Sequence, residues 1–287
     1  MRSAEWRQVR AFAETIRVAP AALAVQGEAG AGKSTLWRAG IQTAAAAGYC
    51  LLRSEPSASE TDLSFAGLSD LLAGVLPLVA DQIPGPQLQA LEIALLLRPA
   101  GGEPPAARAV GLAVLAVLRG CLAEGPVLVA IDDVQWLDEA SLEALTFALR
   151  RVPGGPLSLL VAARTGAAAD PLTAGAPPPS HGWRELVAAI AAADVVDLAP
   201  LDLWQVQNLL PRTVTAAQAR EVARESRGNP FWALQVLASL EDAETPAAAS
   251  AHADRSSGPL AERRCRGGAG RSGGGRPDRR RGGPGSA

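Results

Sequence analysis

Eight consecutive residues near the start of the chain have the types and the spacing needed to bind phosphate. The run Gly27-Glu28-Ala29-Gly30-Ala31-Gly32-Lys33-Ser34 matches the pattern GxxxxGK[ST] in full. Its glycines allow the backbone to turn N–H groups onto phosphate oxygens, and the helix expected to follow adds partial positive charge at its start. We expect Lys33 to reach the β and γ phosphates, the Ser34 hydroxyl to ligate Mg²⁺ and Thr35 to lie near the α phosphate. ATP and Mg²⁺ are therefore the predicted cofactors.

Lysine occurs only once in the chain, and it occurs inside this run. The chain has 27 basic residues, and all of them except Lys33 are arginines. An ammonium group is a compact point charge, whereas a guanidinium is a planar fork, so the two do not substitute for one another at a phosphate. This usage favours a phosphate-binding loop over a glycine-rich turn with a purely structural role.

Charged residues follow two further apolar runs that are predicted to be buried strands. Asp132 and Asp133 come directly after Val127–Ile131, and Arg164 ends the run Leu157–Ala163. Because ligands of open α/β sheets bind at the carboxyl ends of the strands, we expect these side chains beside the phosphate loop. Asp132 is the candidate Mg²⁺ ligand, Asp133 the candidate for orienting the attacking water, and Arg164 a candidate sensor of the γ phosphate.

Short apolar runs alternate with helical patterns along the chain, which predicts a parallel α/β sheet covered on both faces. The expected strands are Ala21–Gln26, Tyr49–Arg53, Pro126–Ile131, Leu157–Ala163 and Val195–Leu198. The expected helical stretches are Gly32–Ala47, Phe65–Val79, Gln87–Leu97, Ala106–Ala123, Ser141–Val152 and Leu203–Leu240. Residues 166–182, rich in Ala and Pro, are predicted to be an exposed loop. Trp204 and Trp232 have a helical spacing consistent with core positions.

The composition narrows the class of protein. Apolar residues make up 48% of the 287 residues and the net charge is −2, so a sizeable core is possible and no overall charge draws the chain to nucleic acid. Cys50, Cys121 and Cys265 are scattered, which argues against a disulfide framework or a structural zinc site. The start of the chain lacks the apolar core of a secretory leader, and no apolar run has the length of a membrane helix. We expect a cytoplasmic protein.

Three regions are expected: an ATP-binding α/β domain over residues 1–200, a helical lid over 201–242, and a disordered Arg/Gly/Pro-rich tail over 243–287. From Ala251 onward nine arginines face three acidic residues, and Leu260 is the only large aliphatic residue. Such a segment cannot bury enough apolar surface to offset the entropy of ordering it. Two interpretations of the tail stay open: a native basic extension, or a reading frame shifted near residues 243–251.

Taken together, the motifs resemble those of the STAND class of P-loop NTPases, and more narrowly the ATPase module of large LuxR-type transcriptional regulators of actinobacteria. The resemblance covers about residues 15–240. It rests on the phosphate loop, on Arg164 at a strand end, and on three further segments, Asp62–Leu68, Asp132–Asp138 and Gly228–Phe231.

This resemblance implies an AAA-like ATPase fold and a switch that binds Mg·ATP and hydrolyses it slowly. It also implies that Arg164 is a first-sensor residue and that Pro230 packs near the nucleotide. ATP and ADP are the expected ligands, and a second copy of the chain or a regulatory protein is the expected protein partner. The sequence contains no segment that resembles the family's DNA-binding module, and no membrane partner is expected.

Two other classes of function stay open. A stand-alone ATPase or kinase would turn over ATP as its purpose, and would need residues that line a pocket for a second substrate. A nucleic-acid-binding protein would use the tail, where Arg266-Gly267-Gly268 and Arg281-Gly282-Gly283 resemble RGG segments. The tail has no aromatic side chains on which bases could stack.

Overall fold

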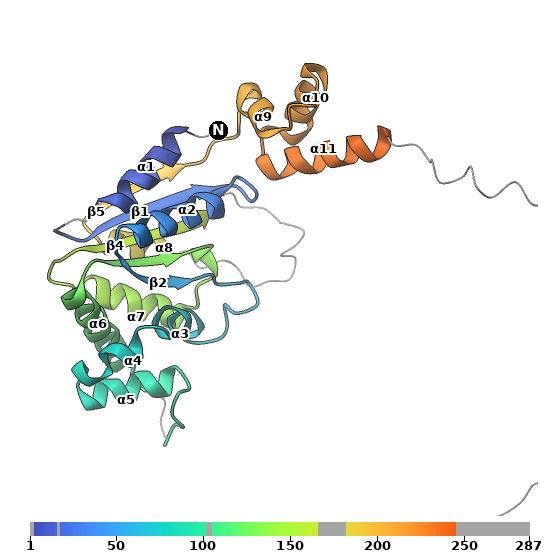
Figure 1. Cartoon of the computed structure of the whole chain (residues 1–287). Coiled ribbons are helices and arrows are strands. Elements are labelled where there is room, and N and C mark those ends of the chain that lie inside the picture. The colour runs from blue at the N-terminus through green and yellow to red at the C-terminus, as the bar shows by residue number, and fades with distance from the viewer. Residues whose placement is uncertain (1–2, 16–17, 102–104, 166–181, 245–287) are drawn as a thin grey trace, which may run out of the picture. The chain divides into compact units, whose positions relative to one another are not determined.

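The computed structural model describes residues 3–15, 18–101, 105–165 and 182–244. In this part of the chain five parallel strands form one sheet in the order β2-β3-β4-β1-β5 (Figure 1). The predicted parallel α/β fold is therefore confirmed. The strands are β1 (Ala21–Gly27), β2 (Cys50–Ser54), β3 (Val127–Ile131), β4 (Leu157–Arg164) and β5 (Ala192–Asp197).

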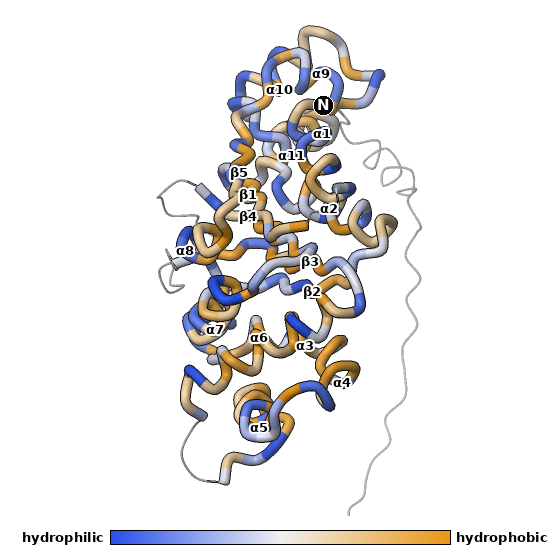
Figure 2. Tube along the Cα trace, turned by 90° about the vertical axis from the view of Figure 1, so that its left-hand side faces the viewer, coloured by the Kyte–Doolittle hydropathy of each residue, from blue (hydrophilic) through white to orange (hydrophobic). Residues whose placement is uncertain are grey.

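The three central strands are buried on both faces, as their continuous apolar runs predict. Alternate residues point to opposite faces, so Leu23, Leu128 and Leu160 pack on one side, and Val129 and Leu159 pack on the other. Figure 2 shows the central strands as mostly apolar. Each of these leucines contributes about 1.5–3 kcal/mol by leaving water.

Two helices cover the first face of the sheet: α1 (Ser3–Glu14) and α2 (Lys33–Ala46). They pack against one another and place Phe12 and Trp37 among the strand residues of that face. A Cβ atom at Gly40 would lie 2.7 Å from a methyl carbon of Leu160, so glycine is needed for α2 to approach the sheet this closely. This packing fixes the start of α2, where the phosphate loop ends.

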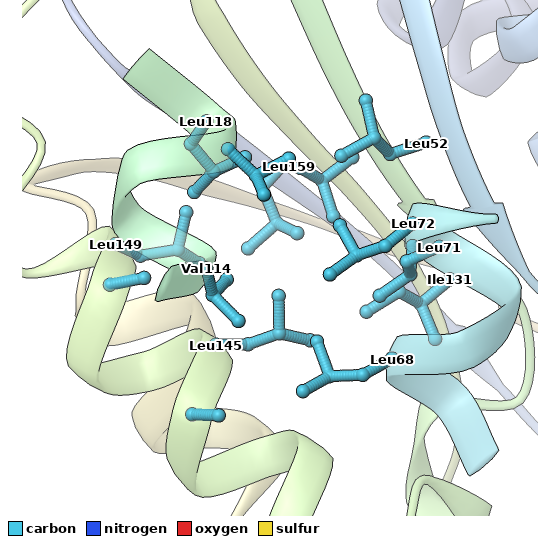
Figure 3. Packing of buried hydrophobic residues seen from close by; sticks show 14 of the residues in the cluster. Leu52, Leu68, Leu71, Leu72, Val114, Leu118, Ile131, Leu145, Leu149 and Leu159 are labelled. Atoms are coloured by element: carbon cyan, nitrogen blue, oxygen red, sulfur yellow. The ribbon is translucent and has the colours of Figure 1, made fainter. Parts of the chain in front are cut away.

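The second face carries the larger core. Leucines from α3, α6 and α7 meet strand residues of β2, β3 and β4 there, as the labelled side chains of Figure 3 show. The helices on this side are α3 (Ala66–Leu72), α4 (Leu76–Val79), α5 (Gly85–Ala94), α6 (Ala107–Glu124), α7 (Glu139–Leu149) and α8 (Trp183–Ala188). Two 3₁₀ turns accompany them, η1 (Ala80–Gln82) and η2 (Val134–Trp136).

Three helices follow the sheet: α9 (Leu203–Leu209), α10 (Ala216–Ser226) and α11 (Pro230–Glu244). They share a separate small cluster that includes Val206, Val222 and Ala233. Capping boxes start α9 and α10, in which Asp202 pairs with Gln205 and Thr215 with Gln218. The described residues up to Ala243 belong to one compact unit.

The structure corrects three expectations. The helical stretch 65–79 is broken into α3 and α4, with Gly74 in the break. Trp204 and Trp232 are 65% and 56% exposed, because the neighbouring positions Val206 and Ala233 supply the buried faces of their helices. In addition, α1 and α8 form where no helix was expected.

Several predictions fall on residues that the structure leaves out. These are the exposed loop over 166–182, of which only Gly182 is described, and almost all of the tail over 243–287. Among the described residues, no helix combines the length and the apolar character that spanning a membrane requires.

Asp138 joins two segments that are far apart in the sequence. Its carboxylate accepts hydrogen bonds from the backbone N–H groups of Phe65, Gly67 and Ser141, at 2.7, 3.0 and 2.8 Å. The side chain is 2% exposed and caps the start of α7. Asp62–Leu68 and Asp132–Asp138, two of the segments behind the family resemblance, are therefore held together by one buried carboxylate.

We expect Asp138→Ala to lower the free energy of unfolding by about 3–5 kcal/mol, because three donors lose a charged acceptor and two of them are buried. Asp202→Ala is the matched control, since it removes an exposed helix cap of the same type. The control substitution should lower the free energy of unfolding by about 0.5–2 kcal/mol. Urea denaturation followed by circular dichroism measures both, and equal losses would contradict the joining role of Asp138.

Candidate nucleotide-binding site

The predicted site residues of three strands meet at the carboxyl edge of the sheet. Gly27, the last residue of β1, is paired with Arg164, the last residue of β4. Asp132 directly follows β3, the strand on the other side of β4. The parallel register thus brings the phosphate loop, the acidic pair and the arginine to one edge, as the rule for open α/β sheets predicts.

The phosphate loop depends on glycine at two positions. Gly30 and Gly32 have φ angles of 75° and 96°, in the left-handed region that other residues rarely adopt. Glu28, Ala29 and Ala31 complete the loop, and Ala31 N–H donates to the Glu28 carbonyl at 3.2 Å. Nothing would meet a Cβ atom at Gly32, so the loop is open to a ligand on that side.

Lys33 is the first residue of α2, and its side chain is buried. It is 5% exposed, and its Nζ donates a hydrogen bond to the Glu28 carbonyl at 2.9 Å. Burial lowers the pKa of Lys33, with Arg164 acting in the same direction, while the charges of Asp133 and Asp132 oppose the shift. The loop therefore holds a desolvated ammonium group beside two carboxylates.

Ser34 and Asp132 form the part of the site that suits a hard cation. Burial raises the pKa of Asp132, and a hydrogen bond with the Ser34 side chain opposes that shift. One Asp132 oxygen also accepts the Asp133 N–H at 2.9 Å. A hydroxyl in contact with a carboxylate is an oxygen donor set that fits Mg²⁺, which completes its octahedron with water and phosphate oxygens.

The described residues do not form a site in which His, Cys, Asp and Glu side chains alone could hold a metal ion. No group of three or more His, Cys, Asp or Glu side chains gathers there as ligands. A cation at Ser34 and Asp132 would therefore need further ligands from water or a bound phosphate. Thr35 lies one residue further into α2, and its place near the α phosphate stays a prediction.

Asp133 and Arg164 form a two-point ion pair across the strand ends. The Arg164 Nε–H donates to Asp133 Oδ1 at 3.2 Å, and an NH2 group donates to Oδ2 at 3.1 Å. Burial alone would raise the pKa of Asp133, but the hydrogen bonds from Arg164 and Gln135 outweigh it and lower the pKa. Asp133 has a φ angle of 40°, in the left-handed region that residues other than glycine rarely adopt.

Gln135 is a residue of this site that the sequence analysis did not select. It is 3% exposed; its amide nitrogen donates to Asp133 Oδ1 at 3.0 Å, and its oxygen accepts the Arg164 backbone N–H at 3.1 Å. Gln135 thus bridges the segment after β3 to the end of β4. In the sequence, only its position within the Asp132–Asp138 segment pointed to a role in the site, because a glutamine by itself does not indicate a particular chemistry.

The start of α11 rests on the phosphate loop. Asn229 caps α11 as predicted, since its side-chain oxygen accepts the Phe231 and Trp232 N–H groups at 3.1 and 3.3 Å. Its amide nitrogen donates to the Ala29 carbonyl at 2.8 Å, and Phe231 N–H donates to the Gly30 carbonyl at 3.3 Å. Pro230, the first residue of α11, lies between these two contacts.

We expect the stability that is lost when Arg164 is replaced to depend on pH, because Arg164 is paired with Asp133. Because the pKa of Asp133 is lowered in the folded state, its contribution is complete above the unfolded pKa and is lost as the pH falls through the folded pKa. Arg164→Met removes the guanidinium. The stability lost by this variant should therefore be greatest above about pH 5 and shrink below about pH 4.

Arg10→Met is the matched control, because Arg10 and Glu14 form an ion pair in which both side chains are more than half exposed. Its effect should be small at every pH, as is usual for exposed pairs. Urea midpoints measured between pH 3 and pH 8 test both variants. A loss in Arg164→Met that does not change with pH would show that the guanidinium does not set the ionisation of Asp133.

Solved structures match most of the chain in fold, and their sequence identity to it is low. The ORC1 protein of Aeropyrum pernix, solved in complex with DNA, matches with a TM-score of 0.50 and 13% identity, over 85% of this chain and 61% of that one. Cdc6p of Pyrobaculum aerophilum matches with a TM-score of 0.50 and 10% identity, over 84% of this chain and 62% of that one. At such identities the likeness shows the fold alone.

The chain spans about three fifths of the length of these solved relatives. None of the curated protein sequences matches it significantly. The family model described as "AAA ATPase domain" matches residues 1–161, more than half of the 287 residues, including the phosphate loop and the acidic pair. The chain therefore belongs to the AAA ATPase domain family.

Proposed function

We propose that the chain binds Mg·ATP at the carboxyl edge of its sheet and acts as a nucleotide-dependent switch that hydrolyses ATP slowly. Membership of the AAA ATPase domain family supports ATP as the ligand. The finer assignment, to a STAND-class module of a LuxR-type transcriptional regulator, is supported by the contact between Asp62–Leu68 and Asp132–Asp138 through Asp138. These segments carry the resemblance to that class.

The observation that carries the switch is the contact between α11 and the phosphate loop. The Ala29 and Gly30 carbonyls of the loop are acceptors for Asn229 and Phe231. A Cβ atom at Gly30 would lie 2.7 Å from the Phe231 Cβ, so the loop and the helix are packed without spare room. A loop that closes around phosphates changes the positions of these carbonyls, and α9–α11 would have to respond.

Three of the four charged residues at the site have a defined part in the proposed reaction. Lys33 exchanges the Glu28 carbonyl for a phosphate oxygen, and Ser34 and Asp132 hold Mg²⁺, which neutralises charge on the phosphates when bound. Asp133 orients the attacking water. A carboxylate whose pKa is lowered is a weak proton acceptor, which supports slow hydrolysis.

Lys33→Ala should weaken Mg·ATP binding roughly 10- to 150-fold, because it removes charge-assisted hydrogen bonds to phosphate. Isothermal titration with Mg·ATP measures the change. Arg151→Ala is the control, since Arg151 is an exposed cation that stacks on Phe147 and should leave the affinity unchanged. Equal affinities in wild type and Lys33→Ala would remove Lys33 from the site.

The switch itself is tested by hydrogen–deuterium exchange in α9, α10 and α11 with Mg·ATP and with Mg·ADP. We expect the two nucleotides to give different exchange rates there in the wild type. Asn229→Ala removes the bond to the loop and should abolish that difference. Asn208→Ala should preserve it, because Asn208 makes a similar bond only within α9, to the Trp204 carbonyl.

Two measurements on the same samples, exchange and hydrolysis, can contradict the switch. If exchange in α9–α11 is the same with both nucleotides while ATP is hydrolysed over many rapid turnovers, the chain is a catalytic ATPase and not a switch. The hydrolysis rate is measured on the same samples, so the two outcomes are distinguished in one experiment.

A further inference from the structure

Two cysteines that are far apart in the sequence meet near the amino ends of the strands, opposite the candidate nucleotide site. Cys50 is the first residue of β2, and Cys121 lies one turn before the end of α6. The turn after α6 connects them: Gly125 N–H donates to the Cys121 carbonyl at 3.2 Å, and Cys50 N–H donates to the Pro126 carbonyl at 2.7 Å. The backbone thereby fixes Cys50 beside the end of α6.

A hydrogen bond joins the side chains of Cys50 and Cys121, and neither cysteine is part of a disulfide. Burial raises the pKa of Cys121 to about 12, and a side-chain hydrogen bond with Cys50 adds to that shift. Cys121 is 4% exposed, whereas Cys50 is only partly buried. Their environments therefore differ: Cys50 is the accessible thiol, and Cys121 is the sheltered one behind it.

Both side chains line the same pocket, which has a volume of about 430 Å³. Val75, Leu78 and Val79 form one wall of it, and the turn Glu124–Pro126 forms another. A small oxidant can therefore reach Cys50 from solvent without unfolding the core. The nucleotide site lies at the carboxyl ends of the strands, so this pocket is separate from it.

We propose that Cys50 and Cys121 form an oxidation site at which a peroxide closes an intramolecular disulfide. In the first step the Cys50 thiolate attacks a peroxide oxygen, the O–O bond breaks, and a sulfenic acid and water (or an alcohol) form. In the second step the Cys121 sulfur attacks the Cys50 sulfur, loses its proton and displaces hydroxide, which leaves as water. The two thiols lose two electrons in total, and the peroxide gains them.

This disulfide would cross-link the sheet to the helix that covers it. Cys50 pairs with Val127 at the start of β3, so the bond would tie β2 to the end of α6 around the turn that already joins α6 to β3. Hydrogen bonds already hold both residues to that turn, which limits how far the two cysteines can move apart. The reverse reaction requires a dithiol reductant.

The test uses the full chain, fully reduced and then treated with hydrogen peroxide at stoichiometric amounts. Remaining thiols are blocked with N-ethylmaleimide, and the protein is digested and mapped by mass spectrometry without reduction. We expect two of the three thiols to be lost and the Cys50 peptide to be joined to the Cys121 peptide. Dithiothreitol should restore both thiols.

Variants separate this pairing from other oxidation products. Cys265→Ser should give the same linked peptides, since Cys265 takes no part. Cys121→Val keeps the buried position apolar, and here Cys50 should stop at a sulfenic or sulfinic acid. The proposal is overturned if Cys50 of the wild type joins Cys265 or a second chain, or if it reaches sulfinic acid while Cys121 remains a thiol. The wild-type map decides this even if a variant fails to fold.

Discussion

Two positive and two negative side chains are held at one sheet edge, and the rest of the site depends on their balance. Lys33 and Asp132 are each only 5% exposed, and Asp133 is paired at two points with Arg164. Burying a charge costs several kcal/mol unless an opposite charge or a hydrogen bond compensates it. The sheet order meets this requirement, because it brings residues of three separate strands within reach of one another.

The need to compensate these buried charges also explains why hydrogen bonds link the strand ends at this edge of the sheet. The Asp132 N–H donates to the Ser54 carbonyl at the end of β2, and the Thr165 N–H donates to the Gly27 carbonyl at the end of β1. Gln135 joins the segment after β3 to β4. Each strand end is thus attached to its neighbour just where a charge is buried, which limits how far the charged groups can move apart.

Much of this arrangement could be predicted from the sequence because it follows from local patterns. The phosphate loop has a fixed spacing, and a continuous apolar run before Asp132 identifies a buried strand whose end meets the loop. The roles of these residues toward ATP and Mg²⁺ stay predictions, as do the limits of the three regions. Asn229 was predicted as a helix cap, and its geometry confirms that.

What the sequence could not predict are contacts that depend on the tertiary fold. The bond from Asn229 to Ala29 joins positions 200 residues apart, and no local pattern encodes it. Gln135 and Asp138 are polar residues in a run that marks a family, but each also bonds a backbone group of a distant segment, whose position only the fold determines. The break in the stretch 65–79 and the exposure of Trp204 likewise depend on which face of a short helix meets the core.

The burial of Lys33 has a practical consequence for chemical labelling. Because the chain contains a single lysine, its only ε-amino group is the one that donates to the Glu28 carbonyl in the phosphate loop. Within this sequence, reagents that acylate amines therefore find a single side chain to modify, and it lies in the candidate nucleotide site. A lowered pKa gives Lys33 more of the reactive neutral amine, while burial restricts access to it. Acylation at this one position thus reports on the opening of the loop, without a background from surface lysines.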